Sequence, residues 1–132
     1  MSLYTLAIID HHGMGRPIIQ AVLYRKDQAQ LQLLLQHALE WAGDNMFADT
    51  VFVVDKSHAE ISALRALFTN SHILLCRFHM AKTFVAEIRK SNLTSSDQET
   101  LYKVCITDLM DHVQCRQKVC AENNLVISFY KY

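Results

Sequence analysis

The strongest constraint on the fold is a short apolar run in the middle of the chain that leads into a carboxylate and a helix start. Val51–Val54 is continuous, apolar and largely β-branched, which is typical of a strand buried on both faces. Ser57 and Glu60 have the spacing of a capping box, so a helix is expected to begin directly afterwards. Asp55 should therefore lie at the carboxyl end of a buried strand, where open α/β sheets bind ligands and metals.

The next segment repeats this pattern. We expect a helix over 58–68, a turn at 69–71, a strand over 72–76 and then another helix. A helical crossover between two strands of one sheet makes them parallel. The strands 51–54 and 72–76 are thus predicted to be parallel neighbours.

The N-terminal part is predicted to form a hairpin followed by a helix. The runs 3–9 and 18–24 are rich in strand formers and flank a turn that contains Asp10. Asp27 can cap the next helix, whose apolar residues keep helical spacing until Gly43. This helix makes strand 18–24 parallel to the strand that ends at Asp55.

Asp10 and Asp55 are consequently expected at opposite edges of the sheet. Strand 3–9 runs antiparallel to 18–24, so the two carboxylates should be about 20 Å apart, or about six residues at roughly 3.3 Å each. Metals in a two-metal site are only about 4 Å apart. We therefore interpret Asp10 as a turn residue.

Composition indicates one intracellular globular unit. Of the 132 residues, 51% are hydrophobic, enough for a real core, and Trp41 and Phe47 are expected to belong to it. The 13 basic and 13 acidic residues cancel, so no global field favours nucleic acid or an anionic membrane. The apolar runs are too short to span a bilayer, so no membrane partner is expected. The four cysteines, without a secretory signal, are predicted to be reduced thiols.

The order of a strand, Asp55 and a helix, then a strand leading into Cys76-x-x-His79 and a helix, resembles the RNase H-like domain of MULE-type transposases. The chain looks like the form of this domain found in SWIM zinc-finger proteins, and the resemblance covers roughly Leu3 to Lys90. The resemblance implies an α/β fold with an RNase H-like mixed sheet and flanking helices. It divides the chain into a partial transposase-derived domain, 1–90, and a helical extension with an uncertain tail, 91–132.

The resemblance also assigns residues to the family's site. Asp55 matches the second acid of a three-carboxylate, metal-dependent nuclease site, and would hold Mg²⁺ or Mn²⁺ if the site were catalytic. Cys76 and His79 match a family motif. The third acid, a Glu on a late helix, cannot be assigned among Glu87, Glu99 and Glu122.

The family's first acid ends a central strand that precedes the hairpin, whereas this sequence begins inside the hairpin. The first central strand is therefore expected to be missing from between 3–9 and 51–54. Unpaired strand edges promote association with other chains. We expect the chain to self-associate through these edges, or to pair the two strands directly.

Each candidate also has a structural interpretation. Asp55 has two interpretations, as an ancestral catalytic acid or as a carboxylate that interacts only with the N-terminus of the helix that follows it. For Cys76 and His79, a buried thiol with a satisfied imidazole is favoured over zinc, which usually takes four protein ligands. The basic residues of the following helix are interpreted as a solvated face, with phosphate contact as the alternative; they are Arg77, Lys82, Arg89 and Lys90.

The favoured functional hypothesis is a fragment of a domesticated, transposase-derived domain that acts as a non-catalytic binding or scaffold module. The resemblance implies a nuclear SWIM zinc-finger-like protein whose partners are DNA or chromatin proteins, and no cofactor is expected for this chain. The alternative is a metal-dependent DNA transposase or nuclease whose first catalytic Asp lies upstream. An incomplete gene model without independent function is a third possibility.

Overall fold

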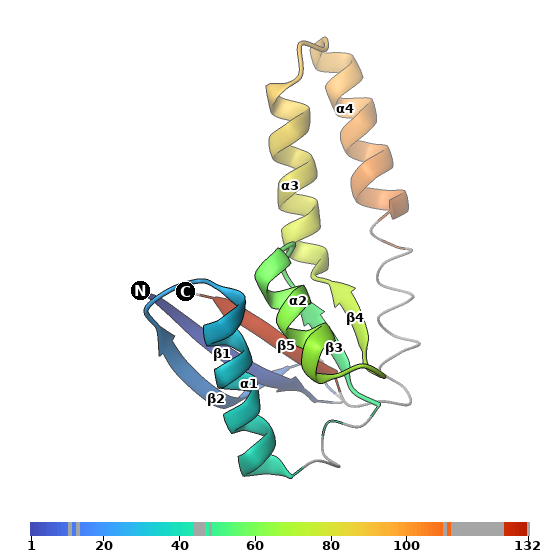
Figure 1. The fold of residues 1–132 in the computed structure, drawn as a ribbon. Helices are drawn as coiled ribbons and strands as arrows, with labels where there is room; N and C mark the ends of the chain where they lie inside the picture. Colours follow the sequence, from blue (N-terminus) through green and yellow to red (C-terminus); the bar gives the residue numbers. More distant parts are fainter. Residues whose placement is uncertain are drawn as a thin grey trace.

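A computed structural model describes residues 1–10, 12, 14–43, 47, 49–109, 111 and 126–131. It shows a five-stranded mixed sheet, two helices packed on one face of it, and two further helices that project away (Figure 1). The predicted α/β class with a mixed sheet and flanking helices is confirmed. The elements in chain order are β1 (Ser2–Ile9), β2 (Gly15–Leu23), α1 (Gln28–Ala42), β3 (Val51–Val54), α2 (His58–Leu67), β4 (His72–Leu75), α3 (Arg77–Lys90), α4 (Ser95–Lys103), the π-helical segment η2 (Val104–Leu109) and β5 (Val126–Lys131).

The N-terminal hairpin and its following helix form as the sequence predicts. Strands β1 and β2 are antiparallel, with a register shift after Leu6. The Asp27 carboxylate accepts a hydrogen bond from the Gln30 backbone N–H at 3.0 Å, which caps the start of α1. Gly43 ends the helix at φ 82°, a backbone angle that glycine adopts without strain, and its N–H donates to the Leu39 carbonyl.

The segment around Asp55 also follows the prediction. Strands β3 and β4 are parallel neighbours in register from Val51 with His72 to Val54 with Leu75. Helix α2 connects them and begins directly after Ser57, whose hydroxyl accepts from the Glu60 N–H. Because α2 is too long to form a tight turn, the chain returns as a crossover and the two strands end at the same edge.

The expectation of a missing middle strand is corrected by the structure. The strand order is β2-β1-β5-β3-β4, so β5, from the far end of the sequence, fills the expected gap. It pairs antiparallel with β1 and parallel with β3. The two edges that were expected to be open are therefore both paired, and β1 and β3 do not pair directly. The physical reason is that β5 supplies backbone donors and acceptors to both neighbours, which would otherwise be left unpaired.

The hydrophobic core lies between the sheet and helices α1 and α2 (Figure 1). The ring centre of Phe52 in β3 lies 4.8 Å from that of Phe68 and 6.2 Å from that of Phe129 in β5, with the rings tilted, so rings from both halves of the sequence meet there. Phe47 is buried as predicted, with its ring 5.6 Å from that of Phe68. The prediction for Trp41 was wrong: this residue lies in the last turn of α1 and is 69% exposed.

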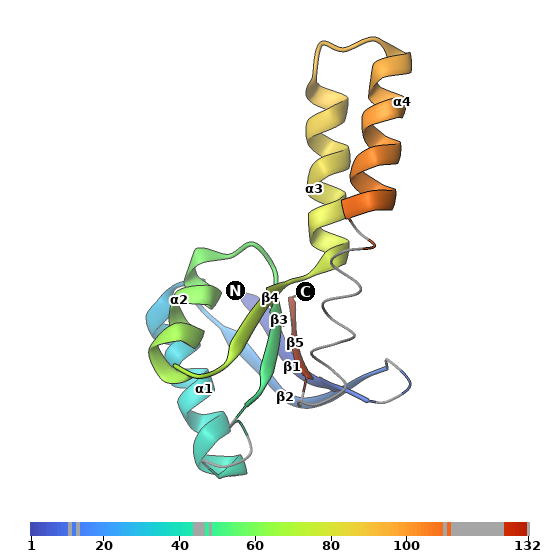
Figure 2. The same ribbon diagram turned by 90° about the vertical axis from the view of Figure 1, so that its right-hand side faces the viewer.

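Helices α3 and α4 form an antiparallel arm that extends from the β4 side of the sheet (Figure 2). Neither helix contains a buried residue. Thr94 caps the start of helix α4, because its hydroxyl accepts a hydrogen bond from the Asp97 N–H at 3.3 Å. In the part of the chain that the structure describes, no helix has the length and apolarity needed to cross a membrane.

The central position of β5 leads to a stability prediction. Ile127 is fully buried between β1 and β3 and belongs to the core. Ile127→Ala should lower the free energy of unfolding by about 2 to 5 kcal/mol, because it removes buried methylenes and leaves a cavity. Urea denaturation of the purified chain measures this change.

The matched control is Val22→Ala on the edge strand β2, where the side chain is 60% exposed. An exposed substitution of this kind should change the free energy by no more than about 0.5 kcal/mol. Equal effects of the two substitutions would contradict the placement of β5 at the centre of the sheet.

Candidate functional site

Asp55 lies where the sequence placed it, directly after β3 and before α2. Its carboxylate Oδ1 accepts a hydrogen bond from the Lys56 N–H at 2.7 Å, and its carbonyl accepts from the Ser57 N–H at 2.7 Å. These bonds hold a tight turn between the strand and the helix. The side chain remains 43% exposed, so the carboxylate is fixed by the turn and accessible to a partner.

The structure brings Asp55 together with the second predicted motif. Cys76 follows β4 directly, and its N–H donates to the Val54 carbonyl at 2.6 Å. His79, in the first turn of α3, places its Nδ1 4.0 Å from Asp55 Oδ1. Because β3 and β4 are parallel and in register, the residues after them meet at one edge of the sheet.

The Asp55–His79 contact is an ion pair only when the imidazole is protonated, and 4.0 Å is too long for a hydrogen bond. The Nδ1 atom is buried and makes no hydrogen bond with any described residue. The expectation of a satisfied histidine was therefore wrong for this atom. The ring instead packs edge-on against Phe78, with the ring centres 5.5 Å apart.

Cys76 is a half-buried free thiol, and Cys105 is another. Both agree with the prediction of reduced cysteines. Cys115 and Cys120 lie outside the described residues.

A buried polar pair lies between α2 and β1. Glu60 is buried in the first turn of α2 and lies beside the buried Tyr4 of β1. Burial, and then the negative charge of the neighbouring Glu60 carboxylate, raise the pKa of Tyr4 to about 12. Sequence reasoning recognised Glu60 only as a cap residue, because nothing local indicates that β1 lies against α2.

Asp10 is a turn residue, as predicted. It accepts hydrogen bonds from the backbone N–H groups of His12 and Met14 and from Arg16 Nε, each at 3.0 Å. The Met14 hydrogen bond and then the Arg16 contact hold the pKa of the Asp10 carboxyl below its usual range. The strand directions place it at the opposite edge from Asp55, so the two carboxylates cannot share a metal.

The other acids considered for the site lie elsewhere. Glu87 is in the last turn of α3, about 12 Å along the helix from His79, and pairs with Lys90 at 3.0 Å. Glu99 is on α4, while Glu122 lies outside the described residues. The basic residues considered with α3 are all exposed, as expected for a solvated face; they are Arg77, Lys82, Arg89 and Lys90.

The described residues do not fit Mg²⁺ or Mn²⁺. No group of three or more His, Cys, Asp or Glu side chains comes together in the described ranges. Mg²⁺ requires near-octahedral oxygen coordination and is held weakly by one carboxylate. Zinc usually takes four protein ligands, and Cys76, His79 and Asp55 do not form such a group. Within the described ranges, Asp55 and His79 form a polar contact pair.

The fold and this edge define an α/β domain that presents one carboxylate beside a histidine at the end of two parallel strands. Comparison with protein families shows that residues 1–83 match the MULE transposase domain. The match covers more than half of the chain and includes Asp55, Cys76 and His79. The chain therefore belongs to the MULE transposase domain family. Comparisons with curated proteins and with solved structures gave no significant match.

The raised pKa of Tyr4 predicts a loss of stability at alkaline pH. The folded-state pKa of about 12 lies above the ordinary value of 10.0, so the stabilisation from neutral Tyr4 is fully present below pH 10. It is lost as the pH rises from about 10 to 12, because the unfolded chain ionises first. Urea denaturation across this range should show a steeper loss for the wild type than for Tyr4→Phe.

Tyr24→Phe is the control, since Tyr24 is exposed on the surface. It should keep the wild-type dependence on pH. Parallel pH profiles for the wild type and Tyr4→Phe would show that Tyr4 is not the group responsible.

Proposed function

We propose that this chain is part of a domesticated, transposase-derived domain of RNase H-like type that acts as a non-catalytic binding or scaffold module. The proposal places it in a nuclear protein with a SWIM zinc finger. Membership of the MULE transposase domain family supports the origin. The non-catalytic role, the zinc-finger context and the nuclear location are the proposed part.

The observation that carries the proposal is the identity of the central strand. Strand β5 is parallel to β3 in register from Val51 with Val126 to Val53 with Ser128. Its carboxyl end, next to Asp55, reads Ser128-Phe-Tyr-Lys131 and contains no carboxylate. In this sheet Asp55 therefore has no acidic partner on the adjacent strand.

A nuclease site of the family type would need a second acid at this position. Two-metal chemistry depends on several oxygen ligands that hold both ions about 4 Å apart. A strand that brought such an acid would have to occupy the place of β5, between β1 and β3. The filled sheet thus favours a module that binds over one that cleaves.

The proposal predicts that the chain neither cleaves DNA nor is stabilised by Mg²⁺ or Mn²⁺. An ion that binds only the folded state raises the melting temperature by mass action. Because neither ion is expected to bind, the melting temperature should be the same with and without each ion. Asp55→Asn should leave both results as they are. Asp10→Asn, at the opposite edge of the sheet, is the matched control.

DNA cleavage that depends on Mg²⁺ or Mn²⁺ and disappears in Asp55→Asn, but not in Asp10→Asn, would overturn the non-catalytic role. A metal-induced rise in melting temperature that only Asp55→Asn removes would have the same meaning.

The binding role needs its own test, and the proposed partners are DNA or chromatin proteins. Fluorescence anisotropy with a DNA duplex and with a reconstituted nucleosome compares them. Binding to the duplex that falls with salt and is weakened by Lys82→Ala would identify DNA, because phosphate contacts release counterions. Binding to the nucleosome alone would identify a chromatin protein. If the chain binds neither the duplex nor the nucleosome, the proposed binding role is contradicted.

A further inference from the structure

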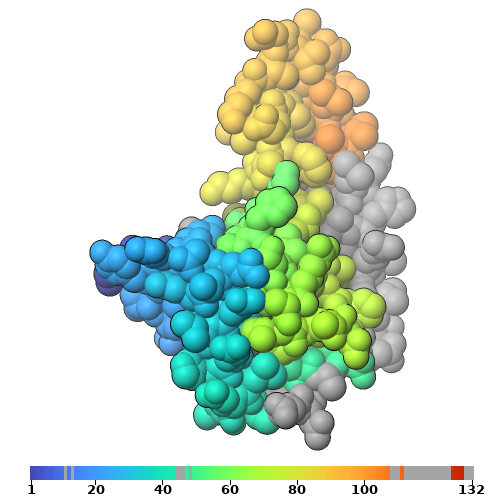
Figure 3. Space-filling model, viewed as in Figure 1, coloured from blue at the N-terminus to red at the C-terminus, as the bar shows by residue number. Residues whose placement is uncertain are grey.

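The arm formed by α3 and α4 carries apolar side chains but has no core of its own. It stands clear of the sheet in the space-filling view (Figure 3). No residue of either helix is buried, and large apolar side chains are exposed along it. These exposed residues are Phe78, Leu93, Leu101, Tyr102 and Val104.

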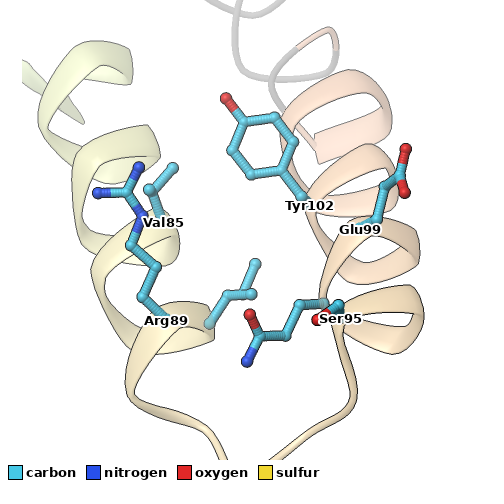
Figure 4. A pocket seen from close by; sticks show the side chains of 7 residues that line it. Val85, Arg89, Ser95, Glu99 and Tyr102 are labelled. Atoms are coloured by element: carbon cyan, nitrogen blue, oxygen red, sulfur yellow. The ribbon is translucent and has the colours of Figure 1, made fainter.

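The two helices are separated by an open groove. Val85, Ile88 and Arg89 line it from α3, and Tyr102 and Glu99 are among the residues that line it from α4. Figure 4 shows the Tyr102 ring and the Val85 side chain directed into the space between the helices. The lining is therefore mixed: Val85, Ile88 and Tyr102 are its apolar part, and Ser95, Gln98, Arg89 and Glu99 are its polar part.

An arm of this kind lacks a packing layer. Helices shorter than about 12 to 15 residues are marginal in water, and most helical stability in proteins comes from burial of an apolar face. Helices α3 and α4 have 14 and 9 residues, and among the described elements α3 contacts only α4 and η2 to a substantial extent. A further pair of helices would complete a four-helix bundle around the groove.

The charges of the arm are complementary to those of a second copy. Helix α3 carries four basic residues and one acidic residue, whereas α4 carries two acidic residues and one basic residue. A two-fold axis parallel to the arms would place α3 of each copy against α4 of the other. In such an isologous interface, the basic α3 of each copy contacts the acidic α4 of the other, so the same opposite-charge contact occurs twice.

We propose that the α3–α4 arm is a self-association surface, on which two copies of this chain pack arm against arm as a four-helix bundle. Arg89 of each copy pairs with Glu99 of the other at the sides of the groove, and Val85, Ile88 and Tyr102 form the apolar centre. A second copy matches both charge signs, whereas nucleic acid would meet Glu87, Asp97 and Glu99 as like charges. The expected association through open edges of β1 and β3 is ruled out, because β5 pairs with both strands. The proposed association through the arm does not depend on whether the domain binds DNA.

Sedimentation velocity of the full chain over a range of roughly 1 to 100 µM should show a monomer–dimer equilibrium. Arg89→Glu places acidic residues on both sides of each pairing, and Glu99→Lys places basic residues there. Each variant alone should weaken the dimer by about tenfold, as expected for like charges placed opposite each other at an interface.

Mixing the two variants tests the contact between copies. In a heterodimer of the Arg89→Glu and Glu99→Lys chains, both pairings again join opposite charges, so an equimolar mixture should regain wild-type association. Contacts within one chain do not change on mixing. Restoration therefore cannot arise from an effect on folding, and far-UV circular dichroism of each variant checks its helix content.

The control is Glu40→Lys, an exposed charge reversal on α1, which should leave association unchanged. A wild-type chain that stays monomeric over the whole concentration range overturns the proposal. So does a mixture that associates no better than either variant alone, or a dimer that neither variant weakens.

Discussion

The whole fold depends on the backbone pairing of β5 with β1 and β3. This strand joins an antiparallel hairpin to a pair of parallel strands that have no direct hydrogen bonds with each other. Without it, two apolar strand edges would expose their N–H and C=O groups, and each buried unpaired group costs about 1 to 3 kcal/mol. The same strand carries Ile127 and Phe129 into the core beside Phe52. One six-residue element therefore provides both the continuity of the sheet and the contact between the two halves of the core.

The position of β5 also determines what the edge at Asp55 can do. Parallel strands end at the same edge of a sheet, so the residues after β3, β4 and β5 are the ones that can act together there. Asp55 follows β3, and Cys76 and His79 follow β4. The end of β5, in contrast, consists of a serine, two aromatic residues and a lysine. A single carboxylate 4.0 Å from an imidazole can bind a polar group but cannot hold a hard divalent ion firmly. The chemistry of this edge thus follows from which strand fills the centre.

The body and the arm of the domain differ in how completely they are packed. Helices α1 and α2 cover one face of the sheet and bury a continuous core, and even Glu60 is enclosed there beside Tyr4. Helices α3 and α4 have no buried residue and leave several large apolar side chains exposed. His79 stands at the base of this arm, next to Asp55, so the edge of the sheet and the arm form adjoining surfaces. Figure 2 shows α3 continuing from the end of β4 into this arm.

The sequence by itself determined the features that depend on a few neighbouring residues. The caps at Asp27 and Ser57, the stop at Gly43 and the buried run before Asp55 each rest on hydrogen bonds or apolar spacing within one turn or one strand, so local patterns predict them. Only the tertiary structure decided where β5 pairs, because its partners lie about 70 or more residues away in the sequence and an apolar run does not specify its neighbours. For the same reason the sequence could not place Trp41 outside the core or Glu60 beside Tyr4, and it could not bring His79 to Asp55. These positions follow from the packing of whole elements against one another, which no local pattern encodes.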